Sequence, residues 1–247
     1  MGKVITVYGS PSSGKTALSV KLANRMSKTR KVNTGVLFSS IFPSPVSYIF
    51  PGFIERDFIS IGEVLSKENI LEEDVLSSLI SPAQSGHICF SGYSSFDHPG
   101  SYPQTDMKRC SEYIKLLSEN LDYLFIDTDT SVHNSLLSKA ALMASGEKIC
   151  AVSTDIKGCS WLSSSRAQIT SSPQDEILVL NDTSGLDAPI SPESKNTESK
   201  CRISMPFSSD LDSQFQSGSL LKGNNPKMDF CLESICRMVE QNGTQNS

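Results

Sequence analysis

The chain has 247 residues, of which 38% are hydrophobic and 20% charged, and its formal net charge is −5. This composition is too apolar for a wholly disordered chain and too polar for a bundle of membrane helices. The acidic balance argues against a general affinity for nucleic acid or anionic lipid. A chain of this length can bury a substantial core, and no apolar run approaches the ~18 residues that a spanning helix needs.

The seven cysteines are widely spaced, and none forms a C-x-x-C pair. Their odd number and spacing predict reduced, mostly buried thiols in a reducing cytosol. The N-terminus lacks a signal-peptide layout, because a lone Lys3 precedes a short apolar run that Ser10 and Pro11 end. We therefore expect a cytoplasmic protein without a transmembrane segment.

Short apolar segments alternate with amphipathic ones along most of the chain. The predicted strands are residues 3–9, 32–38, 87–90, 123–127, 148–152, 176–180 and 202–205. The predicted helices are residues 15–26, 60–66, 71–80, 105–118, 135–144 and 228–240. The strands are continuous apolar runs, which is typical of a parallel sheet covered by helices on both faces. We predict one doubly wound, mostly parallel α/β domain over residues 1–240.

Three segments depart from this alternation. Residues 42–53 are Pro-rich and aromatic, and the two close prolines argue against a regular helix there. The aromatic side chains of this segment suit either core packing or a docking surface for a partner. Residues 182–199 are polar and Ser/Pro-rich, which predicts a mobile loop. Residues 241–247 are predicted to be a disordered tail.

The segment GSPSSGKT at residues 9–16 matches G-x-x-x-x-G-K-[ST] at every fixed position, between a predicted strand and a predicted helix. Its glycines allow a tight curl, so that the amides of Ser12, Ser13 and Gly14 and the positive end of the helix dipole can bind phosphate oxygens. Lys15 would contact the β- and γ-phosphates, and the Thr16 hydroxyl would ligate Mg²⁺. The alternative is a chance match in a Ser/Gly-rich loop.

An acidic residue at the end of a neighbouring apolar strand usually completes such a site by holding the hydrated metal. Asp127 ends the predicted strand at residues 123–127. We therefore predict Thr16 and Asp127 as metal ligands and Lys15 and Asp127 as the catalytic pair, although an Asp can also simply end a strand in a turn. Asp129 either contacts the metal shell or a catalytic water, or it begins the following turn.

Together with DYLFID at residues 122–127, LN at 180–181, MPF at 205–207 and SGSLL at 217–221, the loop resembles the ParA/MinD ATPases. Within this group of P-loop proteins, the sequence is most similar to the CpaE/TadZ branch, which helps to place pili and secretion machines. The resemblance covers nearly the whole chain, but only the loop is highly specific. It implies that ATP and Mg²⁺ bind, that Asn181 contacts the adenine, and that the protein forms a homodimer and acts with a protein partner. The alternative for Asn181 is a cap or turn residue.

Two departures from the family pattern bear on activity. Ser10 stands where the family carries a signature lysine that reaches the partner's nucleotide. No aspartate matches the family's acidic residue after the second strand either, since no Asp occurs between Val32 and Arg56. A cation that stabilises the transition state can contribute about 10³–10⁵ in rate. We therefore expect binding with slow or partner-dependent ATPase activity, in the positioning, partition or assembly of a cellular machine. The alternative is a non-catalytic scaffold that keeps the fold.

Other possible sites receive little support from the sequence. The basic residues near the end of the first helix are expected to form a solvated face rather than a nucleic-acid patch; they are Lys21, Arg25, Lys28, Arg30 and Lys31. The three histidines lack metal-ligand spacing, which argues against zinc. A P-loop kinase or ligase would need an arginine-bearing lid, and the sequence offers no cluster of this kind.

Overall fold

The computed structural model describes residues 1–40, 45–49, 59–82, 87–98, 102, 105–183, 185 and 198–241, without the side chains of Ser47 and Tyr48. Its centre is a seven-stranded sheet in the order β3-β2-β4-β1-β5-β6-β7, in which every pair of neighbouring strands is parallel. The strands are β1 (Lys3–Gly9), β2 (Thr34–Phe38), β3 (Ile88–Ser91), β4 (Tyr123–Asp127), β5 (Glu147–Ser153), β6 (Ile177–Asn181) and β7 (Cys201–Met205).

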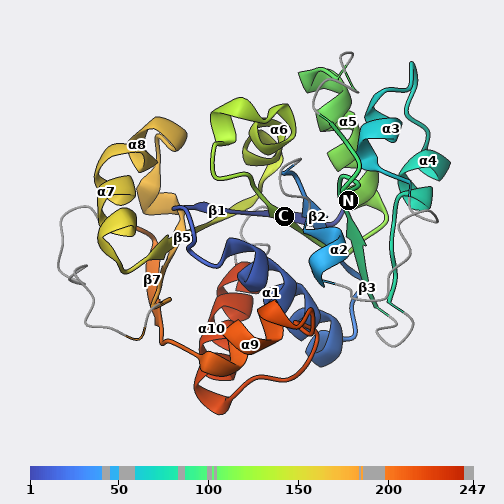
Figure 1. Ribbon diagram of the computed structural model, residues 1–247. Helices are drawn as coiled ribbons and strands as arrows, with labels where there is room; N and C mark the ends of the chain where they lie inside the picture. Colours follow the sequence, from blue (N-terminus) through green and yellow to red (C-terminus); the bar gives the residue numbers. More distant parts are fainter. Residues whose placement is uncertain are drawn as a thin grey trace.

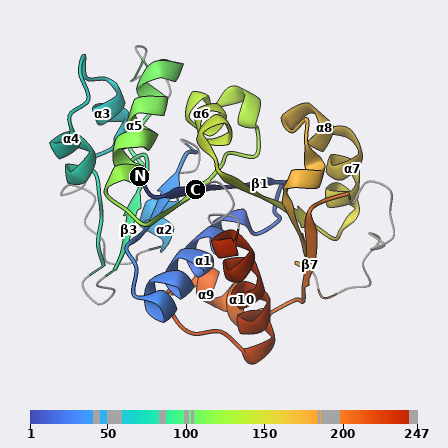
Figure 2. The same cartoon turned by 180° about the vertical axis from the view of Figure 1, so that it is seen from behind.

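Helices cover both faces of this sheet (Figures 1 and 2). One face is covered by α1 (Lys15–Arg30), α9 (Ser209–Gln216) and α10 (Pro226–Gln241), with the short α2 (Val46–Ile49) nearby. The other face carries α3 (Ile61–Leu65), α4 (Glu72–Ser77), α5 (Met107–Glu119), α6 (Leu136–Ala144), α7 (Ile156–Ser164) and α8 (Arg166–Ile169). Two short 3₁₀ helices, η3 (Val132–Asn134) and η4 (Pro173–Asp175), complete the described helices.

Alternate residues of each central strand enter the two halves of the core. In β4, Phe125 packs with α1 and α10, whereas Leu124 and Ile126 pack with α5 and α6. All three side chains are fully buried, and each contributes about 1.5–3 kcal/mol on transfer from water. Burial on both faces explains why the sequence shows continuous apolar runs instead of alternation.

The doubly wound α/β fold predicted from the sequence is confirmed, and the sheet is parallel throughout. The three helices α7, α8 and α9 were not predicted from the sequence, which is Ser-rich in that region. The prediction that residues 42–53 exclude a helix is wrong for α2, because Pro45 directly precedes this single turn, where a missing amide hydrogen costs nothing. Most of the predicted loop at 182–199 and the tail after residue 241 lie outside the described residues. No helix in the described part of the chain is long and apolar enough to cross a membrane.

The prediction of a solvated basic face is wrong for Lys21, Arg25 and Arg30, whereas Lys28 and Lys31 are exposed. Arg25 and Arg30 pair with Glu233 of α10 at 2.9 and 2.8 Å, and Arg30 also pairs with Glu240. Lys21 is 1% exposed and donates to the carbonyl oxygen of Lys222 at 2.9 Å. A helix pairing that the sequence could not show therefore neutralises Arg25 and Arg30.

All seven cysteines are free thiols, and four of them are buried: Cys89, Cys110, Cys150 and Cys236. Burial raises the pKa of each of these four thiols to about 12. They therefore remain protonated at neutral pH and act as core residues.

Candidate functional site

The loop between β1 and α1 is shaped by residues with positive φ angles. Gly9 has φ 150°, and a Cβ there would lie 1.7 Å from the carbonyl oxygen of Ala151 on β5. Gly14 has φ 78° and caps the N-terminus of α1 without a side chain that would occupy the helix end. Ser12, with φ 55°, adopts the same left-handed region, which costs a non-glycine residue about 1 kcal/mol. The loop therefore curls against β5 and exposes the amides at the start of α1.

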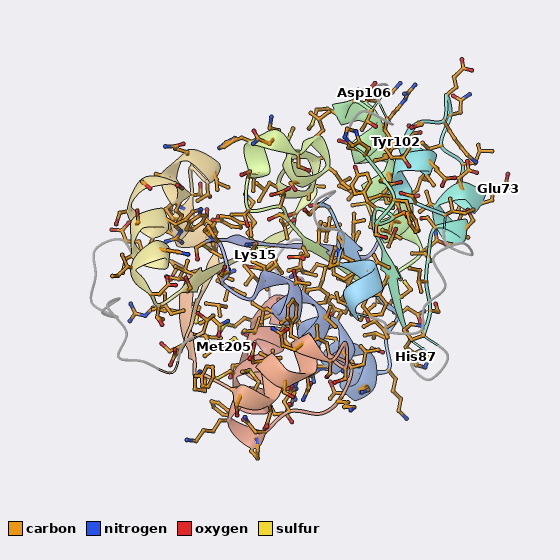
Figure 3. The ribbon with its side chains drawn as sticks, in the orientation of Figure 1. Lys15, Glu73, His87, Tyr102, Asp106 and Met205 are labelled. Atoms are coloured by element: carbon orange, nitrogen blue, oxygen red, sulfur yellow. The ribbon has the colours of Figure 1, made fainter. Side chains whose placement is uncertain are left out.

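Lys15 lies at the centre of the molecule, where the chain passes from the loop into α1 (Figure 3). Its ammonium group donates to the carbonyl oxygen of Ser10 at 2.9 Å and to the hydroxyl of Thr130 at 3.2 Å. Burial lowers the pKa of Lys15, and the charges of Asp127 and Asp129 oppose this effect. A buried ammonium held mainly by neutral oxygens is well suited to bind an anion, because the phosphate would supply the missing counter-charge.

The side chains of Thr16 and Asp127 meet at the edge of the sheet where the strands have their carboxyl ends. The Thr16 hydroxyl donates to Asp127 Oδ2 at 2.6 Å, because the start of α1 lies above the carboxyl end of β4. Burial raises the pKa of Asp127 to about 6, against the opposing effects of the Thr16 hydroxyl and the Lys15 charge. Asp127 Oδ1 is buried and has no hydrogen-bond partner among the described residues.

These two side chains fit a magnesium ion. Hard divalent cations prefer oxygen ligands, and Mg²⁺ is usually held by one or two protein oxygens together with phosphate oxygens. The orphaned Asp127 Oδ1 and the Thr16 hydroxyl offer such oxygens. Within the described residues, no group of three or more His, Cys, Asp or Glu side chains is placed to hold a metal ion without a ligand's help.

Asn181 is the last residue of β6 and lies next to the loop. Its amide Nδ2 donates to the carbonyl oxygen of Ser13 at 2.9 Å, and a Cβ on Gly14 would come within 2.7 Å of the same nitrogen. The residue therefore is neither a helix cap nor part of a turn. It joins the end of β6 to the curled loop.

A cavity of about 830 Å³ joins all these residues. One end contains Lys15, Thr16, Asp127, Thr130 and Ser40, and is polar. The other end, called the aromatic end below, contains the apolar and aromatic residues Pro206, Phe207, Leu211, Phe215 and Met228, together with polar residues such as Asp182, Asp212 and Gln216. The cavity therefore has one end suited to phosphates and one suited to a flat, partly apolar ring.

The charges in this cavity are unbalanced. Among the residues that line it, Lys15 is the basic residue, whereas four are aspartates: Asp127, Asp129, Asp182 and Asp212. A polyphosphate entering this cavity would meet more negative than positive charge. The charge of the cavity therefore favours binding of a polyphosphate together with a divalent cation, which compensates this repulsion.

The two departures noted in the sequence are visible in the structure. Ser10 is fully buried, and its hydroxyl accepts a hydrogen bond from the amide of Ser153 at 3.0 Å. A side chain at this position points into the protein, toward β5. At the end of β2, the hydroxyl of Ser40 donates to Asp129 Oδ2 at 3.3 Å, so a carboxylate from the loop after β4 lies at this strand end.

Sequence reasoning missed several residues that line the cavity. Leu211 and Phe215 come from α9, a helix with no fully buried residue and therefore a weak apolar pattern. A capping signal could have revealed this helix, because the Ser208 hydroxyl accepts from the amide of Leu211 and Asp210 and Asp212 follow in the first turn. Thr130 has no sequence signal beyond its closeness to Asp127.

No protein-family model matches the sequence, and no curated protein sequence matches it. Solved structures do resemble the fold. The septum site-determining protein MinD of Pyrococcus horikoshii OT3, complexed with Mg-ADP, is 16% identical, with a TM-score of 0.76, over 100% of this chain and 99% of that one. A ParA family ATPase from Chlorobium tepidum TLS is 13% identical with a TM-score of 0.73, over 96% of this chain and 98% of that one.

A McdA variant of Cyanothece in complex with ATP is 15% identical, with a TM-score of 0.67, over 97% of this chain and 96% of that one. The chain thus has the fold of the MinD and ParA ATPases along its whole length. The predicted ParA/MinD-type fold is confirmed at this level.

Proposed function

We propose that this chain is a Mg-ATP-binding protein of the ParA/MinD type, whose residues 1–240 form one nucleotide-binding domain. The observation that carries the proposal is the convergence of Lys15, Thr16 and Asp127 at one end of a nucleotide-sized cavity. Three structures of this fold were solved with Mg-ADP, with ATP and with AMPPNP, which supports the choice of ligand.

Each residue has a role in this proposal. The amides of Ser12, Ser13 and Gly14 bind phosphate oxygens, and Lys15 neutralises the β- and γ-phosphates. Thr16 and Asp127 hold Mg²⁺, which supplies charge neutralisation at the triphosphate. Asn181 and the aromatic end of the cavity receive the adenine.

The structural neighbours and the sequence resemblance support a proposal for the cellular role. We infer a cytoplasmic factor for the positioning, partition or assembly of a cellular machine, akin to the CpaE/TadZ branch and acting as a homodimer with a protein partner. Hydrolysis is slow or depends on that partner, since the buried Ser10 cannot extend toward a second protomer as a lysine could.

A second candidate, a scaffold without catalysis, is favoured by the same buried Ser10 and by the lack of an aspartate after β2. In this case the fold and a bound nucleotide serve protein contacts only. Turnover measured with and without candidate partners separates the two, since partner-stimulated hydrolysis excludes the scaffold.

The central test is calorimetric titration of the protein with ATP in the presence and absence of Mg²⁺. Lys15→Ala is expected to weaken Mg-ATP binding at least 100-fold while circular dichroism stays unchanged. Lys108→Ala removes an exposed lysine on α5 and serves as the matched control. Sedimentation of the same samples tests nucleotide-driven dimerisation. A wild-type protein that fails to bind ATP at millimolar Mg²⁺ would contradict the proposal.

A further inference from the structure

Two carboxylates lie at the phosphate end of the cavity, although the proposed metal site uses only one. Asp127 ends β4, and Asp129 follows two residues later in the connecting loop. Asp127 accepts a hydrogen bond from the Thr16 hydroxyl through Oδ2, and its buried Oδ1 remains available to ligate a cation. The side chain of Asp129 is turned the other way, toward the end of β2, where it accepts from Ser40.

The position of Asp129 is fixed from three sides. Its backbone amide donates to Ser138 Oγ on α6 at 3.1 Å, and its Oδ1 accepts from the amide of Ser131 at 2.9 Å. Its Oδ2 accepts from the hydroxyl of Ser40 at 3.3 Å. Such anchoring holds a carboxylate in one orientation without using all of its acceptor sites, because a carboxylate offers about four lone-pair positions.

The sheet topology explains why a residue after β4 can serve the end of β2. The two strands are neighbours and parallel, and Phe38 at the end of β2 is paired with Asp127 at the end of β4. Ser39 strengthens the connection, since its hydroxyl and its amide both donate to the carbonyl oxygen of Asp127 at 3.0 Å. The loop after β4 is therefore bound to the residues that follow β2.

The same loop lies beside the phosphate-binding ammonium. Thr130, the residue after Asp129, accepts a hydrogen bond from Lys15 Nζ at 3.2 Å. Since Lys15 is the group that would contact the β- and γ-phosphates, Asp129 belongs to the γ-phosphate end of the cavity and not to its aromatic end.

We propose that Asp129, held by Ser40, orients the water that attacks the γ-phosphate and so replaces the aspartate missing after β2. The inference rests on the proposed function, since it requires that Mg-ATP binds in this cavity. Asp129 accepts a hydrogen bond from the water and directs the water oxygen at the γ-phosphorus. Ser40 is a positioning residue that keeps Asp129 in this orientation.

The reaction is hydrolysis and balances without a further reactant. The water oxygen forms a bond to the γ-phosphorus, and the bond between that phosphorus and the β–γ bridging oxygen breaks. The electron pair of the broken bond stays on ADP. One water proton remains on the inorganic phosphate, and the other leaves to solvent by way of the Asp129 carboxylate.

The experiment combines Mg-ATP titration with single-turnover hydrolysis over several hours. Asp129→Asn keeps the shape and the backbone contacts and is expected to slow hydrolysis about 100-fold, within the range usual for a positioned base. Its dissociation constant for Mg-ATP is expected to stay within threefold of the wild type. Asp175→Asn makes the same change at an exposed residue of η4 and should alter neither quantity.

Ser40 provides a second, independent arm. Ser40→Ala is expected to slow hydrolysis about 10-fold with unchanged Mg-ATP affinity, and Ser40→Thr, which keeps the hydroxyl, is expected to restore most of the rate. A merely structural role would lower affinity and thermal stability together and would not be rescued in this way.

The outcomes separate this inference from the proposed function. Wild-type protein that does not bind Mg-ATP overturns both. Wild-type protein that binds ATP but hydrolyses it neither alone nor with candidate partners, or an Asp129→Asn variant that hydrolyses at the wild-type rate, overturns the inference alone. An Asp129→Asn variant with much weaker Mg-ATP binding would instead make Asp129 a metal ligand and also overturns it.

Discussion

Thr16 and Asp127 are 111 residues apart in the sequence, yet the hydroxyl of the first donates to the carboxylate of the second at 2.6 Å. The contact joins the first turn of α1 to the last residue of β4. It also leaves Asp127 buried, with one oxygen lacking a hydrogen-bond partner among the described residues. A buried carboxylate of this kind destabilises the folded protein when no cation is bound, and binding of a cation removes this destabilisation.

Asp127→Asn should therefore stabilise the nucleotide-free protein. Burial raises the pKa of Asp127 to about 6, above the value of 3.8 for an unfolded chain. The folded state then holds a proton that the unfolded state has lost, so stability falls as pH rises from about 4 to 6. At pH 7 the buried carboxylate of Asp127 lowers the free energy of unfolding by at most about 3 kcal/mol, and its replacement by the neutral Asn side chain removes this cost.

Thermal unfolding between pH 4 and pH 8 provides the measurement for Asp127→Asn. The variant is expected to unfold at a higher temperature at pH 7 and to lack the decline between pH 4 and pH 6. The same variant should bind ATP without dependence on Mg²⁺ and more weakly. A lower unfolding temperature at pH 7 would argue against a destabilising carboxylate.

Gly9→Ala is expected to destabilise the protein by about 3 kcal/mol or more, because the new methyl group would lie 1.7 Å from the carbonyl oxygen of Ala151. Chemical denaturation gives the free energy of unfolding. The matched control is Gly146→Ala, where the nearest atom lies 3.9 Å away. Equal stability of the two variants would show that β1 and β5 separate more easily than their contact suggests.

Phe215→Ala is expected to weaken ATP binding about fivefold, because the ring forms part of the aromatic end of the cavity and such a contact contributes about 1 kcal/mol. Binding of inorganic tripolyphosphate, which has no base, should not change. Phe230→Ala removes a ring of α10 that is 74% exposed and outside the cavity lining, and it should leave both affinities unchanged. A variant that loses affinity for both ligands would place Phe215 at the phosphates.

Glu233→Gln is expected to loosen α10 from α1. Its carboxylate contacts Arg25, Arg30 and Arg237 at distances between 2.8 and 3.0 Å, and the bonds from Arg30 are the main cause that lowers the pKa of Glu233 to about 2. A carboxyl group with a lowered pKa stabilises the fold when the pH is above the pKa of that group in the unfolded chain. This contribution is lost as the pH falls from about 4.5 to 2. After allowance for solvent screening, the loss at pH 7 is about 1 kcal/mol.

Denaturation at low and high salt tests this prediction for Glu233. The difference between wild type and Glu233→Gln should shrink at 1 M salt, because screening acts on a partly exposed network. Glu119→Gln removes an exposed pair with Lys115 at 3.9 Å and should change stability little at any salt concentration. A difference that persists unchanged in salt would point to packing and not charge.

The sequence predicted the positions of the strands well, because strands buried on both faces are short, continuous apolar runs. The strands Lys3–Gly9 and Tyr123–Asp127 have the predicted bounds, and the other five differ by one or two residues at their ends. The sequence did not indicate α9, because that helix has no fully buried residue and so lacks a clear apolar pattern. It also placed Arg25 and Arg30 of α1 in solvent, since it cannot show that they face Glu233 of α10.

The sequence by itself determined the parallel α/β fold and the phosphate-binding loop, because both depend on local patterns: apolar runs, helix periodicity, and glycines at fixed spacing. Only the tertiary structure decided which distant groups share the cavity. Strand order brings the end of β4 beside both β1 and β2, so that Asp127 meets Thr16 while Asp129 meets Ser40. Contacts of this kind depend on the order of strands in the sheet, which no local spacing in the chain encodes.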